Sequence, residues 1–129
     1  MKKRLSALGL VLALLLTLCA CGLASRTPAD GLTVYFLDVG QADSALVVCD
    51  GAAMLIDGGN VADAQYVVSA LAQRGVTALQ AVVATHCDED HCGGLAGVLA
   101  KYPAQRVLCS VTEHDTKAFS DFVKYADVQ

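Results

Sequence analysis

Residues 81–94 read AVVATHCDEDHCGG, and this stretch decides how the whole chain is interpreted. The apolar run 81–84 has the composition of a buried strand. The next segment, residues 86–91, carries two imidazoles and three carboxylates. Two consecutive glycines, at 93 and 94, then let the backbone turn tightly into a helix. The stretch therefore predicts a strand, a loop crowded with polar side chains and a helix in succession.

The side chains of this loop suit a divalent metal, because imidazole nitrogens and carboxylate oxygens are the ligands that such ions take in proteins. His86 ends the strand, so its ring can project into a cleft at the edge of a sheet. A loop folded around one point could bring His86 and Asp88 to one ion, and Asp90 and His91 to a second. Two ions about 3.5–4 Å apart would activate water and polarise a phosphoryl or acyl oxygen. The loop therefore predicts a metal-dependent hydrolase.

Two other interpretations of the loop stay open. Asp88, Glu89 and Asp90 could form a solvated acidic turn beside incidental histidines. Cys87 and Cys92 could instead join the two histidines at a structural zinc site, although their spacing fits the usual zinc-finger patterns poorly. If the loop holds no metal, little else in the sequence indicates a function.

The segments on either side of the loop predict an α/β domain whose sheet is covered by helices. We expect strands at Leu32–Asp38, Ser44–Cys49, Ala53–Asp57, Leu79–Thr85 and Arg106–Val111. Helices are expected from the cap Asn60 to Arg74, from Gly94 to Tyr102 and from Ala118 to Tyr125. Asp50-Gly51 indicates a hairpin turn, and Gly75 ends the first helix.

Side-chain patterns also predict which residues are buried. One face of the first helix should carry Ala64, Val67, Val68, Leu71 and Ala72. Cys49 and Cys109 lie on strand-like segments, so we expect them to be small buried apolar residues.

The first 20 residues have the layout of a secretory signal. A basic start, Lys2-Lys3-Arg4, precedes an apolar run, residues 5–18, that is shorter than the roughly 20 residues of a spanning helix. Leu18-Cys19-Ala20-Cys21 resembles a bacterial lipobox, in which Cys21 would be lipidated; a plain secretory signal cleaved nearby is the alternative. Residues 21–31 would then be the anchor and tether, and 32–129 the domain. We expect an extracytoplasmic protein with a lipid anchor in the bacterial cell membrane.

Net charge and cysteine content limit the kinds of partner and cross-link that the sequence supports. Removing residues 1–20 would leave six basic against 13 acidic residues, a net charge of −7 compared with −4 for the whole chain. Such a domain has no basic stripe to attract a phosphate backbone. Outside the cytoplasm, Cys49, Cys87, Cys92 and Cys109 could form disulfides, but four cysteines allow three connectivities and the sequence does not choose among them.

Four segments together resemble the metallo-β-lactamase fold. The loop resembles its metal-binding signature, His-x-His-x-Asp-His followed by Gly-Gly. The others are Phe36–Ser44 (FLDVGQADS), Leu55–Gly59 (LIDGG) and Val83–His86 (VATH). Together they are similar to the subgroup that includes the C-terminal hydrolase-like domain of ComEC-type DNA-uptake proteins and related secreted or lipid-anchored proteins. The resemblance covers residues Leu32 to Leu99.

The resemblance implies roles for the loop residues. His86 would bind a first metal, while Asp90 and His91 would hold a second, with Asp90 also accepting a proton. Asp88 stands where the family usually has a second histidine, which favours harder ions. We therefore expect up to two divalent ions, zinc in first place and manganese as the alternative.

Residues outside the loop also acquire roles. The resemblance makes Asp57 a carboxylate that orients the loop through hydrogen bonds, although a plain turn residue fits equally. Asp43 and Ser44 would lie near the site, with a structural role favoured over substrate binding. Ala42 replaces a usual glycine, which would cost on the order of 1 kcal/mol if the position needs a positive φ. His114 is interpreted as a surface turn residue.

The length of the chain fits only the N-terminal half of the αββα sandwich, a β-hairpin followed by alternating helices and strands. The family's remaining ligands come from later segments, and a half-sandwich leaves apolar sheet surface uncovered. A gene fragment, completion by a second chain and a homodimer are the three explanations we consider.

The expected function is an exported metal-dependent hydrolase acting on a phosphodiester or related ester. The alternative is a non-enzymatic surface-anchored fragment that needs a partner chain to complete its metal site. The substrate could be a small molecule; nucleic acid is implied by fold analogy alone, which is a weak warrant.

Overall fold

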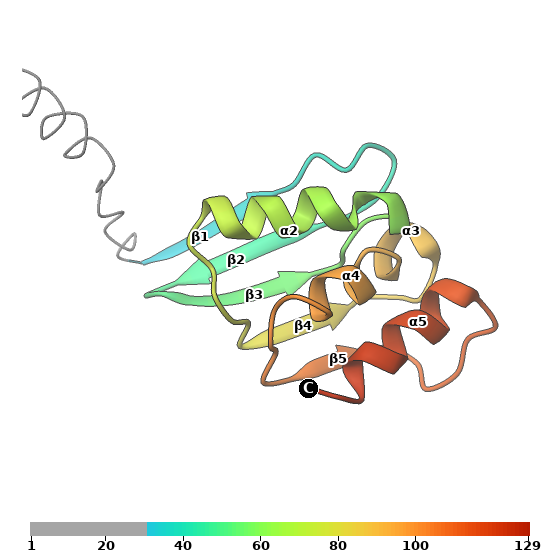
Figure 1. Ribbon diagram of the computed structural model, residues 1–129. Coiled ribbons are helices and arrows are strands. Elements are labelled where there is room, and N and C mark those ends of the chain that lie inside the picture. Colours follow the sequence, from blue (N-terminus) through green and yellow to red (C-terminus); the bar gives the residue numbers. More distant parts are fainter. Residues whose placement is uncertain (1–30) are drawn as a thin grey trace, which may run out of the picture.

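The computed structural model describes residues 31–129 of the chain, and these residues build one mixed five-stranded sheet (Figure 1). The predicted signal segment, the lipidation site Cys21 and most of the tether lie outside the described residues. The strands are β1 (Leu32–Phe36), β2 (Ala45–Cys49), β3 (Ala52–Ile56), β4 (Ala81–Ala84) and β5 (Val107–Cys109). They lie in sequence order, antiparallel from β1 to β3 and parallel from β3 to β5.

Helices lie on one side of this sheet (Figure 1). They are the 3-10 turn η1 (Val61–Asp63) and the α-helices α2 (Ala64–Gln73), α3 (Glu89–Cys92), α4 (Leu95–Leu99) and α5 (Lys117–Ala126). The longer connections, from β3 to β4 and from β4 to β5, contain α2 and α3–α4, as parallel neighbouring strands require. The predicted α/β class, a sheet covered by helices, is therefore confirmed.

Two local predictions hold for physical reasons visible in the backbone. At the hairpin between β2 and β3, Asp50 and Gly51 have φ of 49° and 82°, the left-handed values that a tight hairpin turn needs. Before α2, the backbone N–H of Asn60 donates to the Asp63 carboxylate at 2.9 Å. This bond satisfies a donor at the helix start, and one turn of 3-10 helix precedes the α-helix.

Other boundaries and burial predictions were wrong. The strand expected over residues 106–111 is only β5, and the helix expected from Gly94 to Tyr102 is the shorter α4 followed by a turn. Part of the predicted ligand loop is helical, because α3 begins after Asp88 with two acidic residues in its first turn. On α2, Ala70 is buried and Ala72 exposed, since the helix turns its 67, 70 and 71 positions to the sheet.

The two faces of the sheet differ sharply. On the face under the helices, Leu46, Leu55 and Val82 are fully buried and pair across neighbouring strands. On the other face, a single row of paired residues runs across all five strands: Phe36, Ala45, Ile56, Val83 and Leu108. The two ends of this row, Phe36 and Leu108, are 87% and 52% exposed. Within residues 31–129 no helix covers that face, and none of the helices is long and apolar enough to cross a membrane.

Candidate metal centre

Backbone hydrogen bonds bring three separate segments together at the carboxyl ends of β3 and β4. The N–H of Asp43 donates to the carbonyl oxygen of Asp90 at 3.0 Å, and the N–H of Gly58 donates to that of His91 at 2.7 Å. The N–H of Gly59 donates to the carbonyl of Asp43 at 2.9 Å. The ligand loop is therefore tied through main-chain atoms to the turn after β3 and to the turn before β2.

The two glycine pairs explain how these segments approach so closely. A Cβ atom added at Gly94 would lie 2.0 Å from the carbonyl oxygen of Gly58, and one added at Gly58 would lie 2.7 Å from the amide nitrogen of Leu95. The N–H of Gly94 donates to the carbonyl of Gly59 at 2.9 Å. Any side chain at these positions would push the ligand loop away from β3.

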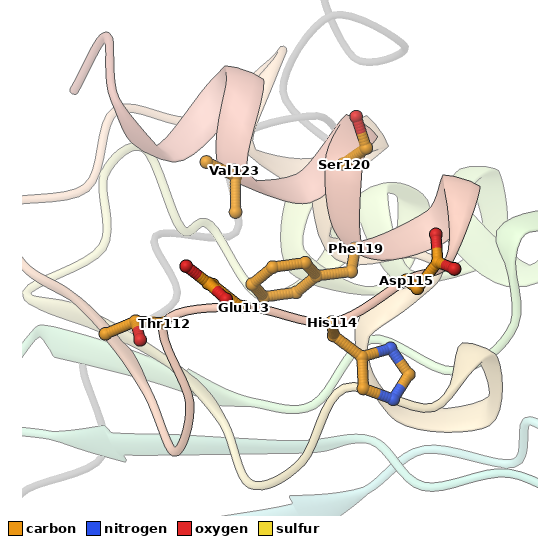
Figure 2. Close-up of a pocket in the computed structure, with 7 residues that line it drawn as sticks. All are labelled: Thr112, Glu113, His114, Asp115, Phe119, Ser120 and Val123. Carbon is orange, nitrogen blue, oxygen red and sulfur yellow. The ribbon is translucent and has the colours of Figure 1, made fainter.

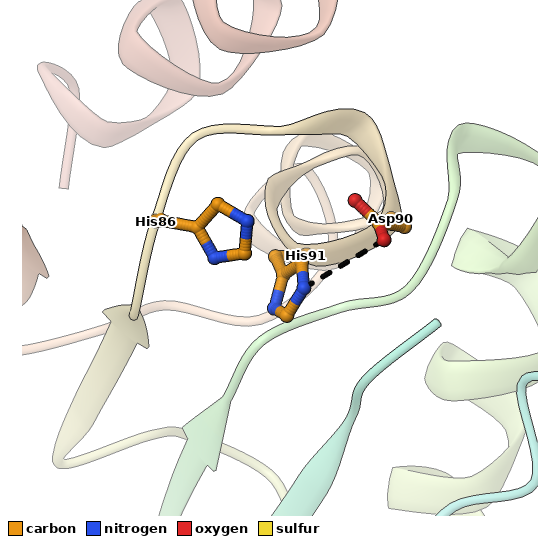
Figure 3. A group of neighbouring side chains, drawn as sticks. All are labelled: His86, Asp90 and His91. Atoms are coloured by element: carbon orange, nitrogen blue, oxygen red, sulfur yellow. Dashed lines mark ion pairs between the residues drawn. The ribbon is translucent and has the colours of Figure 1, made fainter. Parts of the chain in front are cut away.

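Three of the predicted ligands form a compact cluster (Figure 3). One ligand atom from each of His86, Asp90 and His91 lies within 4.8 Å of the other two. The Nε2 atom of His91 is 3.7 Å from the nearer carboxylate oxygen of Asp90. The His86 and His91 rings lie against each other, with centroids 3.7 Å apart. These side chains come from the end of β4 and from α3, so the strand-to-helix junction places all three.

A buried carboxylate orients His91. Asp57 is only 3% exposed, and its Oδ2 atom lies 3.1 Å from Nδ1 of His91. The same carboxylate accepts from the backbone N–H of Thr85 at 2.8 Å and from the Thr85 hydroxyl at 2.6 Å. In the tautomer with the proton on Nδ1, His91 donates to this carboxylate, and the lone pair of Nε2 is free for a metal.

The backbone of Asp57 is itself unusual. Its φ of 56° lies in the left-handed region, where a residue other than glycine costs on the order of 1–3 kcal/mol. Asp57 therefore fills both roles considered from the sequence: it is a turn residue, and its carboxylate also supports the loop. Thr85, which holds the carboxylate in place, was missed by the sequence analysis, although it directly precedes His86.

The residues between β1 and β2 contribute a carboxylate and a buried hydroxyl. Oδ2 of Asp43 lies 3.6 Å from Nε2 of His91, the ring nitrogen opposite the one that contacts Asp57. Ser44 is buried, and its hydroxyl donates to the carbonyl oxygen of Asp57 at 3.0 Å. The positive φ of this turn belongs to Gly40, at 66°, and not to Ala42, so the strain considered for Ala42 does not arise.

Asp88 lies outside the three-residue cluster and contacts two histidines. Its carboxylate oxygens are 3.4 Å from Nε2 of His86 and 3.5 Å from Nε2 of His114. His114 is in an exposed segment, as a surface turn predicts, but its ring reaches the ligand loop. Nothing in the spacing of the sequence signals this contact, because it depends on how the segment after β5 folds back.

His114 also borders an open groove of about 580 Å³ (Figure 2). The lining residues come from the segment after β5 and from the first turns of α5: Thr112, Glu113, His114, Asp115, Phe119, Ser120 and Val123. Ring contacts join His114 to Phe119, with centroids 6.0 Å apart. The groove is therefore linked to the ligand loop through the contact between His114 and Asp88.

The cysteines near the cluster point elsewhere. Cys87 is 3% exposed, and its Sγ atom lies 3.2 Å from Sγ of Cys109. The Cys92 thiol donates to the carbonyl oxygen of Cys87 at 3.2 Å. Burial, with the Cys109 contact second, raises the pKa of Cys87 to about 12, and burial raises the pKa of Cys92 to about 11. Within residues 31–129 neither sulfur belongs to a metal-ligand group, so the cysteine–histidine zinc site is not formed.

The predicted burial of Cys49 and Cys109 was wrong, because both are exposed. Each is the last residue of its strand, and β5 is an edge strand with a neighbour on one side only.

The donor set fits a divalent metal. Two imidazole nitrogens and a carboxylate are the three protein ligands typical of an open catalytic site for zinc or a related ion. The buried Asp57 beneath His91 is the kind of partner that metal-binding histidines usually have.

The fold is α/β, and a His/Asp cluster that could hold a metal follows the carboxyl end of β4. Residues 37–128 match the profile of the Metallo-beta-lactamase superfamily, and the chain belongs to that superfamily. This is a family of hydrolases whose fold usually binds divalent metals.

Individual relatives agree with this assignment. The chain is 37% identical over 68 residues to the hydroxyacylglutathione hydrolase of Stenotrophomonas maltophilia strain R551-3, a match that covers 53% of this chain and 25% of that protein. A structure described as the peroxy diiron species of the chemotaxis sensor ODP matches with a TM-score of 0.51 and 25% identity, over 64% of this chain and 35% of the sensor. The structure of metallo-beta-lactamase SMB-1 bound to 2-mercaptoethanesulfonate matches with a TM-score of 0.50 and 20% identity, over 63% of this chain and 35% of that protein. The chain thus spans a quarter to about a third of the proteins it matches.

Proposed function

We propose that this protein is a divalent-metal-dependent hydrolase that cleaves a phosphodiester or a related ester. The observation that carries the proposal is the orientation of His91. Its Nδ1 atom is held by the buried Asp57, and its Nε2 atom faces the carboxylates of Asp90 and Asp43. Histidines that bind a metal through one ring nitrogen usually have such a partner at the other, and this supports a ligand at Nε2.

The proposal gives each residue of the cluster a task. His86, Asp90 and His91 would hold the metal, and Asp88 would join through its contact with His86. A bound divalent ion supplies Lewis acidity and lowers the pKa of water. Asp90, the one carboxylate of the three, would accept a proton during hydrolysis. Asp43 would keep the Nε2 side of His91 polar and negatively charged.

Metal identity and substrate are finer parts of the proposal. Zinc is the first expectation, with manganese favoured by the aspartate at 88 and iron added by the diiron sensor among the structural relatives. For the substrate, the ComEC-like motifs favour a phosphodiester, with nucleic acid as an extension by analogy. The hydroxyacylglutathione hydrolase among the relatives adds an acylglutathione ester as a second chemistry to assay.

The proposed location is outside the cytoplasm, with the protein held at the bacterial membrane by a lipid on Cys21. Three protein ligands leave room in a metal's coordination sphere for water and substrate, and a second chain or a second copy of this chain could add a further ligand. A non-enzymatic role is the second candidate. The observation in its favour is the exposed apolar row from Phe36 to Leu108, which fits a partner better than water.

The test combines metal content with hydrolysis. The full chain would be purified from its membrane fraction, analysed for zinc, manganese and iron, and assayed on an activated phosphodiester and on an acylglutathione. His86→Ala and Asp90→Ala should lose metal and activity together, whereas Asp38→Asn, an exposed carboxylate outside the cluster, should keep both. Full activity in both cluster variants would overturn the proposal. Metal binding without turnover on either ester would favour the non-enzymatic candidate.

A further inference from the structure

Three cysteines lie around the ligand loop, and one pair has its sulfur atoms in contact. Sγ of Cys87 and Sγ of Cys109 are 3.2 Å apart, about 1.2 Å further than the bonded distance of roughly 2.0 Å in a disulfide. The two residues are 22 positions apart in the sequence. Cys87 directly follows the ligand His86, and Cys109 ends β5.

Neither of the other described cysteines competes for these partners. Cys92 is fully buried, with its thiol donating to a backbone carbonyl, so it faces the core. Cys49 ends β2, which runs antiparallel to β3, and therefore lies at the opposite end of the sheet from the ligand loop. Among the four described cysteines, Cys87 and Cys109 are therefore the pair whose sulfur atoms are in contact.

The pair is also reachable from solvent. Cys109 is exposed, whereas Cys87 beside it is buried. An oxidant can therefore react with Cys109 first, and the Cys109 sulfur of the resulting mixed disulfide is then within reach of Cys87. Export, proposed above, would place the pair in a compartment where disulfides persist.

We propose that Cys87 and Cys109 form a reversible disulfide that ties the metal-ligand loop to the end of β5. The oxidant is a protein or small-molecule disulfide. Cys109 attacks it and releases one thiol; Cys87 then attacks the Cys109 sulfur and releases the second. Both cysteines lose their protons and one S–S bond forms, while the oxidant's S–S bond breaks and takes up two electrons and two protons.

The bond has a consequence for the loop that rests on the proposed function. Cys87 lies between His86 and Asp88, so a covalent link at this position restrains both of their side chains. Restraint before binding lowers the entropy lost when a metal is taken up. The oxidised protein should therefore bind metal more tightly than the reduced protein.

Peptide mapping tests the bond itself without reference to any metal. The full chain would be equilibrated in glutathione buffers of defined ratio, quenched with acid, alkylated and digested with trypsin and Glu-C protease. Cleavage after Arg74, Glu89, Arg106 and Glu113 places Cys87 in peptide 75–89, Cys92 in a separate peptide, and Cys109 in peptide 107–113. We expect peptides 75–89 and 107–113 to be linked in oxidising buffer and separate in reducing buffer.

A stability measurement and a variant complete the test. The oxidised form should unfold about 10 °C above the reduced form, because the link closes a loop of about 20 residues. Cys109→Ser, a change at an exposed site, should abolish that difference. Linkage of Cys109 to any other cysteine, or free peptides in oxidising buffer, would overturn the proposal. After glutathione is removed, equal zinc affinity of the two forms would overturn its ligand-restraint part, whereas no zinc binding in either form would count against the proposed function instead.

Discussion

Asp57→Asn separates the metal-supporting role of this carboxylate from its place in the fold. Asparagine tolerates the left-handed region, so the φ of 56° adds little cost in the variant. Asp57 makes three hydrogen bonds through its carboxylate, two to Thr85 and one to His91. An amide can satisfy only part of this set, because one of its two ends is a donor.

Each orientation of the new amide breaks one contact. If the NH2 group faces His91, then Nδ1 must accept, the ring proton moves to Nε2, and the metal-facing lone pair is lost. If the NH2 group instead faces the backbone N–H of Thr85, two donors meet at about the present 2.8 Å. We expect a loss of roughly 1–3 kcal/mol in the free energy of unfolding and a 10–100-fold weaker metal affinity.

The assay is competition of the full chain with a coloured chelator for zinc, alongside urea unfolding of the metal-free protein. Asp38→Asn serves as the matched control, since it removes the same charge at an exposed position. If Asp57→Asn binds zinc within twofold of the parent, His91 is not held for a metal and the reasoning fails. Equal weakening in both variants would assign the effect to net charge instead.

Three further predictions concern packing and thiol reactivity. Gly94→Ala should cost about 3 kcal/mol or more in urea unfolding and also weaken metal binding, because its Cβ would lie 2.0 Å from a backbone oxygen of the facing glycine turn; a stable variant would mean that the two turns can separate freely. Phe122→Ala should cost about 3–5 kcal/mol, since this ring is 1% exposed, and a loss below 1 kcal/mol would show that α5 contributes little to the core. In the fully reduced protein at pH 8, a maleimide should label the exposed Cys109 before Cys87 and Cys92. The pKa values of about 12 for Cys87 and 11 for Cys92 leave few thiolates, and burial blocks access to both. Equal labelling rates of the three cysteines, measured by mass spectrometry, would contradict the burial of Cys87 and Cys92.

The sequence predicted the positions of the five strands and the proximity of three of the proposed ligands, because both depend on local patterns. The turn at Asp50-Gly51 needs left-handed backbone, and short segments of three to five mainly apolar residues mark the strands. His86, Asp90 and His91 are close together in the sequence, so a single tight turn is enough to bring them together.

Features that depend on tertiary packing could not be predicted in the same way. The exposure of Cys109 follows from β5 being a short edge strand, and an apolar segment carries no sign of which edge it occupies. The approach of His114 to Asp88 depends on the path of the segment after β5. The start of α3 did have a signal, since Asp88 precedes two acidic residues, but the metal-ligand interpretation of those carboxylates obscured it.

Main-chain hydrogen bonds make most of the contacts that hold the ligand loop in place. Amide and carbonyl groups of Asp43, Gly58, Gly59 and Gly94 hold the loop, while the side chains that would touch a metal project from it. Exchange of one of these side chains for another would therefore leave the main-chain hydrogen bonds intact. The aspartate at position 88, where the family usually has a histidine, is an example of such an exchange. We therefore expect a substitution among these side chains to alter the metal preference while the folding stability stays nearly unchanged, provided that the glycines are kept.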